Sequence, residues 1–371
     1  MYNNIYQIQE EFTMKKKTVR VISALLLVCM LISLAIPAFA SSDGTSFSFR
    51  FDSKQKTVRN TYPDYKAIFD AEYSTTPVPG VERTKFGDGD VSTTMVPQGL
   101  CIAGNYLLVT AYDYEKVHNS VIYVMSNDDV KNRRLLSTVV LPDKNHVGGI
   151  TFDGEYVWVA RSTKKEIGAI KLSDFDEAAK HEVYSVNYYK KVKCLTTASF
   201  ITYYDGKIWV GLYDADKAAT LQGFELDKET MTLNLKCTAV VPKRCQGAAF
   251  TERNGKTYLI TSSSYGRNLS SYIRSYEFSY NGGKGDTSLV NEFTLPPMTE
   301  ELEICGDHLL IMTEAPATEY SVASANRCIN PMDRISAAKL DDIVSDEPVG
   351  FFARLWAKFI DFLGKLFGIT C

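Results

Sequence analysis

The sequence lacks the short motifs by which several enzyme classes are recognised. It contains no G-x-S-x-G, H-E-x-x-H or P-loop sequence, so an α/β-hydrolase, a zincin and a P-loop nucleotide-binding protein lose support. No C-x-x-C pair is present either, and a structural zinc site is therefore not expected. Histidine is scarce, with four residues in a chain of 371, which leaves few side chains that ordinarily titrate near neutral pH.

Basic residues are not concentrated in any long run after the N-terminal segment. The chain has 41 Lys and Arg against 44 Asp and Glu, for a formal net charge of −3 at pH 7. Phosphate binding needs a concentrated basic surface. We therefore expect no nucleic-acid partner.

A long apolar run lies close to the N-terminus. From Met14 the chain reads MKKKTVRVISALLLVCMLISLAIPAFA, with a basic start, an apolar stretch over 21–36 and an Ala-x-Ala sequence at Ala38–Ala40. This order is typical of a secretory signal peptide. We expect residues 1–40 to be removed and the protein to be secreted or extracellular. An uncleaved membrane anchor is the alternative.

Eight cysteines are present, and outside the signal segment they are widely spaced. In a chain large enough to bury its own core, we expect most of them to behave as small buried hydrophobic residues. A bridge between Cys194 and either Cys237 or Cys245 is an alternative that spacing does not decide.

The body of the chain is rich in Tyr, Phe, Val and Thr, in short alternating runs that are typical of strands. A two-strand unit recurs five times when it is aligned on a central glycine turn. Repeats of this size with several strands each predict the blades of a β-propeller. The copies are VPQGLCIAGNYLLVTAYDY from Val96, HVGGITFDGEYVWVARSTK from His146, ASFITYYDGKIWVGLYDAD from Ala198, RCQGAAFTERNGKTYLITSSSYG from Arg244 and TEELEICGDHLLIMTEAP from Thr299.

A third strand follows each pair, and a fourth follows in all copies but the fifth, as in HEVYSVNY from His181. We expect SFSFRFDSK from Ser46 to supply the missing strand, because a propeller has to cover its last exposed edge. Residues 41–95 then form a lead-in with this closing strand, and residues 96–345 form an all-β, five-bladed propeller. The alternative is a six-bladed propeller with one degenerate blade hidden in the lead-in.

An amphipathic helix is predicted near the C-terminus, within residues 346–371. FFARLWAKFIDFLGKLFG from Phe351 places aromatic and aliphatic side chains on one helical face and charged side chains elsewhere. Residues 351–368 could rest on a membrane surface or a partner and attach the protein to the cell surface. Alternatively, the helix packs across the base of the propeller. We expect a monomer.

The geometry of a propeller predicts where a site would lie. The starts of the innermost strands and the loops after the second strands meet at one mouth of the central channel. Surface loops are polar even without a ligand, but Gln or Glu at the same repeat position in three blades favours a ligand site. The ligand-binding residues predicted in this way are Gln98, Tyr112, Asp113, Arg161, Tyr213, Asp214, Arg244, Gln246, Tyr265 and Arg267.

Acid and base candidates occupy the same set of positions. The predicted catalytic residues are Glu300 and Glu314, together with His146, the only histidine placed at the channel. Glu301 is a further acid beside them, and the arginines suit an anionic substrate. Calcium could bind through Glu300 and Asp113, because carboxylates suit a hard cation, although no cofactor is clearly indicated.

The blocks VPQGL, TAYDY, HVGGITFDG, CQGAAF and LPPMTEELEI resemble secreted bacterial β-propeller proteins, most of them without an assigned function. The resemblance covers about residues 95–340. In that family the last block commonly reads Glu-Gly where this chain has Glu300 and Glu301. The architecture is also similar to lactonase, arylesterase and strictosidine-synthase-like propellers, which hold calcium or a small substrate at the axis. This resemblance implies a fold and not an activity.

Together these observations predict a secreted β-propeller that binds a small polar or anionic molecule, such as a sugar derivative, in its axial funnel. One hypothesis is a hydrolase-like or lyase-like enzyme that uses Glu300 and His146 as acid and base. The other is a non-enzymatic propeller that binds a glycan or a protein at the cell surface. The sequence does not separate the two hypotheses.

Overall fold

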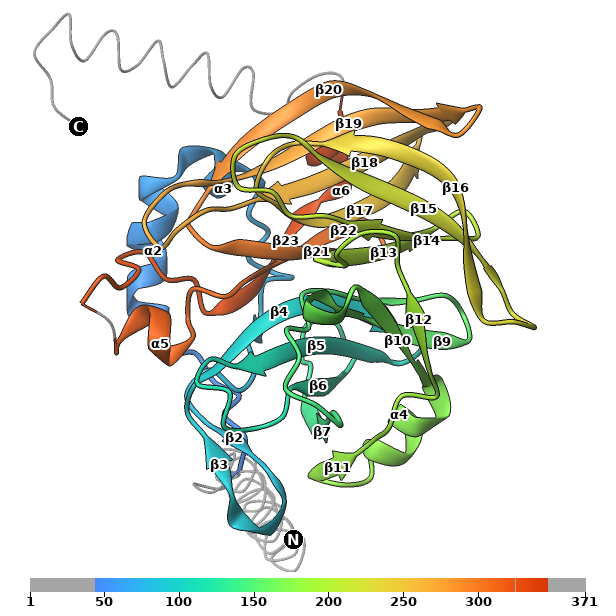
Figure 1. Cartoon of the computed structure of the whole chain (residues 1–371). Coiled ribbons are helices and arrows are strands. Elements are labelled where there is room, and N and C mark those ends of the chain that lie inside the picture. The colour runs from blue at the N-terminus through green and yellow to red at the C-terminus, as the bar shows by residue number, and fades with distance from the viewer. Residues whose placement is uncertain (1–43, 324, 346–371) are drawn as a thin grey trace, which may run out of the picture. The chain divides into compact units, whose positions relative to one another are not determined.

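The computed structural model describes residues 44–323 and 325–345. The predicted signal peptide and the predicted C-terminal amphipathic helix lie outside these ranges. Within them, strands dominate and follow one another as antiparallel meanders (Figure 1), which confirms the all-β prediction. Among the helices of these two ranges, none has the length and apolar character that a membrane span requires.

The first three meanders run from residue 95 to residue 241. Consecutive strands pair in each of them, with the earliest strand at one edge. The first contains β4 (Met95–Ala103), β5 (Tyr106–Asp113), β6 (Val121–Ser126) and β7 (Leu135–Val140); the second contains β8 (Ile150–Phe152), β9 (Tyr156–Arg161) and β10 (Glu166–Lys171); the third contains β13 (Phe200–Tyr204), β14 (Lys207–Gly211), β15 (Ala219–Asp227) and β16 (Thr232–Val241).

Two further meanders complete the series. The last of them also contains two short helices, α5 between β22 and β23, and α6 after β23. The fourth meander contains β17 (Cys245–Arg253), β18 (Lys256–Ser263), β19 (Ser271–Asn281) and β20 (Lys284–Leu295); the last contains β21 (Thr299–Cys305), β22 (His308–Thr313) and β23 (Arg334–Lys339), with α5 at Thr318–Ser321 and α6 at Leu340–Val344.

The turn between the first two strands of a meander centres on the glycine that defines the sequence repeat. Gly104, between β4 and β5, has a φ of 56°, and Gly206, between β13 and β14, has a φ of 69°. Glycine adopts this left-handed conformation without the steric cost that a Cβ atom imposes. The repeat glycine is therefore required by the turn, and aligning the sequence on it recovers the strand pairs.

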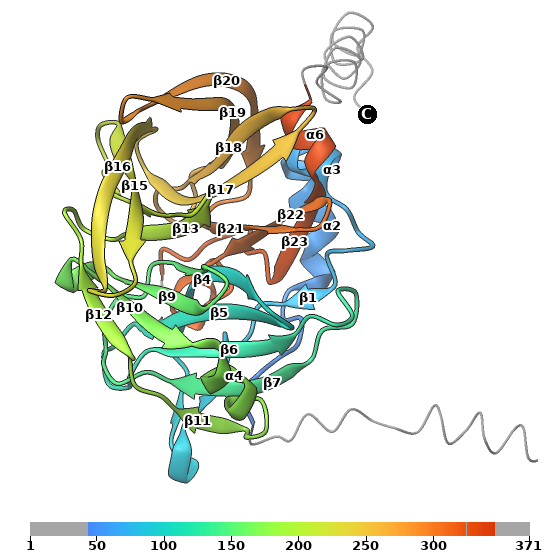
Figure 2. The same ribbon diagram turned by 90° about the vertical axis from the view of Figure 1, so that its right-hand side faces the viewer.

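The innermost strands of the meanders form a ring. β4 lies beside β8, β8 beside β13, β13 beside β17, β17 beside β21, and β21 beside β4. Figure 2 shows these strands near the centre and the later strands of each meander toward the outside. Sheets that radiate from a shared axis are the arrangement of a β-propeller, so the propeller prediction is confirmed at the level of architecture.

The outer edges depart from the repeat in two places. The segment from His181, predicted as a fourth strand of its own sheet, contributes β11 (Val183–Ser185), which pairs in parallel with β7 of the preceding sheet. β12 (Lys190–Lys193) takes the outer place beside β10, after the helix α4 (Leu172–Ala178). The third and fourth sheets also join, through a parallel contact of β16 with β20. These pairings cover strand edges that would otherwise be exposed.

The lead-in completes the last sheet, but not with the predicted segment. β1 (Thr76–Pro77) pairs antiparallel with β23, with Thr76 opposite Ile335. Pro77 suits an outermost strand, because proline cannot donate a backbone hydrogen bond. The prediction of a closing strand from Ser46 is wrong. The backbone of Ser46 bonds to Arg83 and Gly80, at 2.8 Å each, and the chain then enters the helix α2.

The rest of the lead-in forms no blade of its own within the described residues. It contains α2 (Asp52–Thr61), α3 (Pro63–Ile68), the short strands β2 (Thr84–Lys85) and β3 (Val91–Ser92), and one turn of 3₁₀-helix at Gly87–Gly89. Tyr65 of α3 is buried against Ile273 and Phe293 of the fourth sheet, and its hydroxyl lies 2.6 Å from Ser336 Oγ of the last sheet. The two helices therefore hold these sheets together.

The space between sheets is filled by apolar and aromatic side chains. Trp209 of the third sheet packs against Phe250 and Phe278 of the fourth, with ring centroids 5.0 and 5.7 Å apart. The cysteines of the described ranges are free thiols, so the bridge considered for Cys194 does not form. These thiols are Cys101, Cys194, Cys237, Cys245, Cys305 and Cys328.

Candidate functional site

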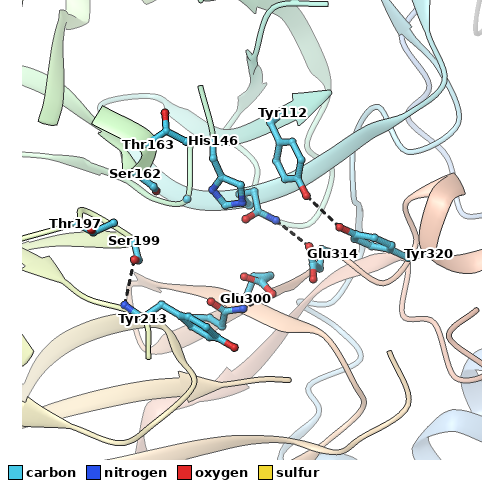
Figure 3. A pocket seen from close by; sticks show the side chains of 13 residues that line it. Tyr112, His146, Ser162, Thr163, Thr197, Ser199, Tyr213, Glu300, Glu314 and Tyr320 are labelled. Atoms are coloured by element: carbon cyan, nitrogen blue, oxygen red, sulfur yellow. Dashed lines mark hydrogen bonds between the residues drawn. The ribbon is translucent and has the colours of Figure 1, made fainter. Parts of the chain in front are cut away.

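A pocket of about 540 Å³ opens where the inner strands meet (Figure 3). Each meander contributes the same repeat position to it, just before its innermost strand or among that strand's first four residues. These five positions are Gln98, Gly148, Ser199, Gln246 and Glu300. The other lining residues are Tyr112, His146, Ser162, Thr163, Thr197, Tyr213, Glu314 and Tyr320.

Three of the inner strands carry a β-bulge at this position. The register shifts between Pro97 and Leu100 in β4, between Cys245 and Gly247 in β17, and between Thr299 and Leu302 in β21. A bulge inserts an extra residue, bends its strand and re-aims a side chain. The bulged strands are those that carry Gln or Glu at the repeat position, so the bulges direct two amides and one carboxyl group into the pocket.

Glu300 and Glu314 form a hydrogen-bonded carboxyl pair on the pocket wall. Glu300 lies on β21 and is 3% exposed, and Glu314 follows β22. Each acid also accepts from one amide: Gln246 Nε2 donates to Glu300 Oε1 at 3.1 Å, and Gln98 Nε2 donates to Glu314 Oε2 at 2.9 Å. The four side chains thus form a continuous chain, Gln98–Glu314–Glu300–Gln246.

The pKa values of both acids are raised. Burial is the main cause for each, because it penalises the charged form. It raises the pKa of Glu314 to about 7, against the opposing effect of the hydrogen bond from Gln98. The pKa of Glu300 is raised well above its usual range by burial and by the neighbouring Glu314 carboxyl. Near neutral pH the pair therefore retains at least one proton.

His146 lines the pocket as a neutral imidazole near neutral pH. Burial, assisted by the positive charge of Lys116, lowers its pKa to about 4. Its ring lies 4.5 Å from that of Tyr112, and its Nδ1 atom is buried with no hydrogen-bond partner among the described residues. The neutral imidazole suits a hydrogen bond to a ligand, and the expected role of His146 as an acid or base stays a prediction.

Tyrosines and hydroxyl groups form the remaining wall. Tyr112 and Tyr320 share a hydrogen bond of 3.0 Å between their hydroxyl oxygens, beside Glu314 in Figure 3. On the other side of the pocket, Ser162 Oγ donates to the carbonyl oxygen of Ala198 at 2.7 Å, and Ser199 Oγ accepts from the backbone N–H of Tyr213 at 3.1 Å. The pocket thus has a carboxyl side and a hydroxyl side.

Sequence reasoning placed seven of its thirteen site residues in this pocket and missed others. Thr163 and Thr197 line it although neither was predicted. Thr163 lies two residues after the predicted Arg161, and Thr197 lies just before the third repeat copy, which begins at Ala198. Widening the same argument to the adjoining loop residues would have found them. The predicted residues found in the lining are Gln98, Tyr112, His146, Tyr213, Gln246, Glu300 and Glu314.

The predicted arginines do not line the pocket. Arg161 forms ion pairs with Asp143 and Glu166, which hold its guanidinium in the second sheet. Arg244 lies over the ring of Tyr265, 4.1 Å from its centroid. The described lining therefore contains no Lys or Arg side chain that could bind the anionic ligand expected from the sequence.

Of the four other predicted residues outside the lining, Arg267, Asp214 and Tyr265 lie close to the pocket or on the surface. Arg267 stacks over Tyr320 at 4.8 Å, at the edge of the pocket. Asp214 accepts hydrogen bonds from the backbone N–H groups of Asp216 and Lys217, and Tyr265 is 45% exposed. Asp113 is treated with calcium below.

The residues expected to hold calcium do not come together. Asp113 is buried and accepts hydrogen bonds from the backbone N–H groups of Val117 and His118, at 2.9 and 2.7 Å, and from the Thr94 hydroxyl. It is not among the lining residues that surround Glu300. Within residues 44–323 and 325–345, no cluster of three or more His, Cys, Asp or Glu side chains could hold a metal ion.

Glu301 lies beside the pair and is more deeply buried, with 1% of its surface exposed. Its Oε1 accepts from the backbone N–H groups of Ala248 and Leu302, both at 3.2 Å, and burial raises its pKa well above the usual range. A Cβ atom on Gly247 would lie 2.4 Å from Oε1, and one on Gly149 would lie 3.0 Å from Oε2. These two glycines leave room for the carboxyl group between the inner strands.

No protein-family model and no curated protein match the sequence. Among solved structures, the chain is similar to Myxococcus xanthus glutaminyl cyclase, with a TM-score of 0.39, 10% identity, and coverage of 66% of this chain and 91% of that one. It is similar to an exo-β-1,3-galactanase from Phanerochaete chrysosporium, with a TM-score of 0.40, 13% identity, and coverage of 65% and 59%. Kuenenia stuttgartiensis hydrazine synthase gives a TM-score of 0.35 and 11% identity, and the match spans 62% of this chain and 59% of that one. Similarities this weak carry no argument about activity.

Proposed function

We propose that this propeller binds a small polar molecule in its axial pocket and that Glu300 and Glu314 act on it as an acid–base pair. The hydrogen bond between the two carboxyl groups carries the proposal. Two carboxylates in contact repel each other when both ionise, so the pair keeps a proton that exposed acids lose. Strongly shifted pKa values of this kind gather at functional sites.

The pair is suited to proton transfer near neutral pH. Burial raises the pKa of Glu300, which therefore holds its proton more tightly than an exposed acid, while Glu314, with a pKa of about 7, is partly ionised and accepts one. General acid–base catalysis is most efficient when the pKa lies near the working pH. A hydrolase-like reaction would use the pair to activate water, and a lyase-like reaction would use it to move a proton of the substrate.

The geometry favours these reactions over two others. Glycosidases hold their two carboxyl groups about 5 to 9.5 Å apart, which is farther than a hydrogen-bonded pair. Nucleophilic catalysis by a serine or cysteine needs that side chain next to a base. In the described lining there is no cysteine, and the hydroxyl groups of Ser162 and Ser199 are engaged with backbone groups.

The first test compares the full chain with three variants, Glu300→Gln, Glu314→Gln and the exposed control Glu229→Gln. Sugars, sugar acids, hydroxy acids and amines are screened by thermal shift, and each compound that raises the melting temperature is followed for conversion by NMR. We expect the wild type and the control to bind and convert the ligand. The two pocket variants should convert it at least about 100-fold more slowly.

Other outcomes of this screen are equally informative. Binding without conversion, lost in the pocket variants, would support the non-enzymatic alternative, a propeller that binds a glycan or a protein. A wild type whose melting temperature responds to no compound, or pocket variants that convert the ligand as fast as the control, would contradict the proposal.

We further propose that the propeller has five blades and that the protein is secreted. The cyclic order of the inner strands supports the first proposal, and an experimental structure with a sixth radial sheet would contradict it. The order of basic, apolar and Ala-x-Ala segments supports the second. N-terminal sequencing of protein recovered from the culture medium should give Ser41 as the first residue.

A further inference from the structure

The pocket lining combines acids and amide acceptors with an absence of cationic side chains. No Lys or Arg belongs to the described lining, and His146, the one basic side chain in it, is neutral above a pKa of about 4. Arg161 and Arg244 are held in contacts of their own. Negative charge that develops on the carboxyl pair therefore meets no cation within the lining.

We propose, on the basis of the function proposed above, that the ligand carries a protonated amine, which the Glu300–Glu314 pair receives. An ammonium group has three donors and no acceptor, and the pair offers carboxyl oxygens to them. Gln98 and Gln246 each direct their NH₂ group at one of these acids. The carbonyl oxygens of the two amides are thereby left as further acceptors beside the pair.

An aromatic ring lies on the same side of the site. Tyr213 lines the pocket next to Glu300 in Figure 3. Burial is the main cause of the raised pKa of the Tyr213 hydroxyl, and the nearby charge of Glu300 is the second. The face of a tyrosine ring attracts a cation. Tyr320 is less available for this contact, because Arg267 already lies over its ring.

Binding of such a ligand should release a proton. Near neutral pH the pair retains at least one proton, and a cation placed against it favours the ionised form and lowers its pKa. A neutral ligand of the same shape leaves the proton in place. The groups that surround the pair and could contribute to its titration are, in the lining, Gln98, Gln246, Tyr112, Tyr213, Tyr320 and His146 and, outside it, Glu301 and Arg267.

Isothermal titration calorimetry on the full chain tests this inference with matched probes. Glucosamine is compared with glucose, and glycinamide with glycolamide, so that each pair differs only in an amine against a hydroxyl group. Titrations in phosphate and in HEPES, which differ in ionisation enthalpy, report the protons released. We expect the amine to bind at least about tenfold more tightly than its hydroxyl partner, a difference of ~1.4 kcal/mol, and to release protons.

Two variants locate the effect. Glu314→Gln should abolish the proton release and most of the preference for the amine, whereas the exposed control Glu229→Gln should leave both unchanged. Proton release that persists in Glu314→Gln would place its source elsewhere and overturn the inference. Equal binding of amine and hydroxyl partners, or no binding of either amine, would overturn it as well.

The two proposals fail in different ways. If neutral compounds of the earlier screen bind, depend on Glu314 and are converted while both amines fail, the amine inference falls and the acid–base pair stands. If an amine binds with proton release but nothing is converted, the ligand class stands and the catalytic role falls.

Discussion

The Glu314 carboxyl group titrates differently from an exposed acid because of where it is placed. It directly follows β22, faces Glu300 and accepts a hydrogen bond from Gln98. Burial is the largest cause of its raised pKa of about 7. A group that binds its proton more tightly in the folded than in the unfolded chain stabilises the fold at low pH and loses that contribution as pH rises.

We therefore predict that the free energy of unfolding falls as the pH rises from about 4.5 to about 7. The lower limit is the ordinary pKa of a glutamate, and the upper limit is the pKa of Glu314 in the folded chain. This one group should account for about 1 to 3 kcal/mol of the fall. Glu314→Gln should reduce the fall in free energy over this pH range by that amount, and Glu229→Gln should not. Urea denaturation at a series of pH values measures it, and an unchanged slope in Glu314→Gln would contradict the raised pKa.

The His146 ring gives a second prediction at this scale. Its pKa of about 4 follows from burial and from the nearby charge of Lys116. NMR of ¹³C-labelled histidine should show one imidazole that stays neutral through the range in which an ordinary histidine titrates, and His146→Gln should remove that signal. A His146 midpoint near 6.5, the ordinary value, would show that the ring is solvated.

Sequence reasoning found the residues whose position alone brings them to the pocket, such as Gln98, Gln246 and Glu300 at the strand starts. It misplaced residues whose side chains have a stronger partner nearby. Arg161 directly precedes Ser162, which lines the pocket, yet ion pairs with Asp143 and Glu166 hold it elsewhere. Such competition depends on distances across a sheet, which one sequence does not contain.

Among the elements, the bulged inner strands decide the shape of the site. Glycine follows the repeat position in β4 and β17, where another inner strand comes close. A Cβ atom on Gly247 would lie 2.4 Å from Glu301 Oε1 and 2.8 Å from Glu301 Cα, so backbone as well as side chain would have to shift. Added volume of this kind in a packed interior costs roughly 1 to 3 kcal/mol.

Gly247→Ala should therefore destabilise the protein by about 2 kcal/mol and weaken ligand binding, because the bulge of β17 also aims Gln246. Gly87→Ala is the matched control, since a Cβ atom there would meet nothing within 4 Å. Chemical denaturation and the thermal-shift assay measure the two effects. Equal stability of the two variants would show that the inner strands have room to separate.

The strand pairs were predictable and the edges were not, for a physical reason. Alternating apolar residues around a glycine turn identify β4 with β5 or β13 with β14, because both signals are local. β1 has two residues, Thr76 and Pro77, which is too short to show a period. The segment from His181 is strand-like in sequence, but β11 pairs with β7 of the preceding meander, and a local pattern does not name a distant partner.

At the scale of the whole molecule, Asp333 joins the lead-in to the last sheet. It is fully buried, and its Oδ2 accepts from the backbone N–H groups of Arg50 and Phe51, at 2.7 and 2.5 Å, where α2 begins. Hydrogen bonds to a charged group contribute about 1.5 to 3 kcal/mol, and a donor left buried without a partner adds to the loss.

We predict that Asp333→Ala lowers the free energy of unfolding by about 3 kcal/mol, while Asp333→Asn, which keeps a carbonyl acceptor, costs less. The destabilisation should extend to the pocket, because the same sheet carries Glu300. Denaturation followed by tryptophan fluorescence, with ligand binding measured in parallel, tests this. A stability change with the alanine no larger than with the asparagine would contradict the role of the acceptor.

The pairing of Thr76 with Ile335 also sets the order of events during synthesis. A ribosome completes β1 early and β23 only after all the intervening sheets, so the short strand has no partner while most of the nascent chain emerges. Non-local pairing of this kind slows folding and leaves apolar surface exposed in the meantime. Completion of the last sheet is therefore a late event, and a nascent chain that ends before residue 334 lacks the strand with which β1 pairs.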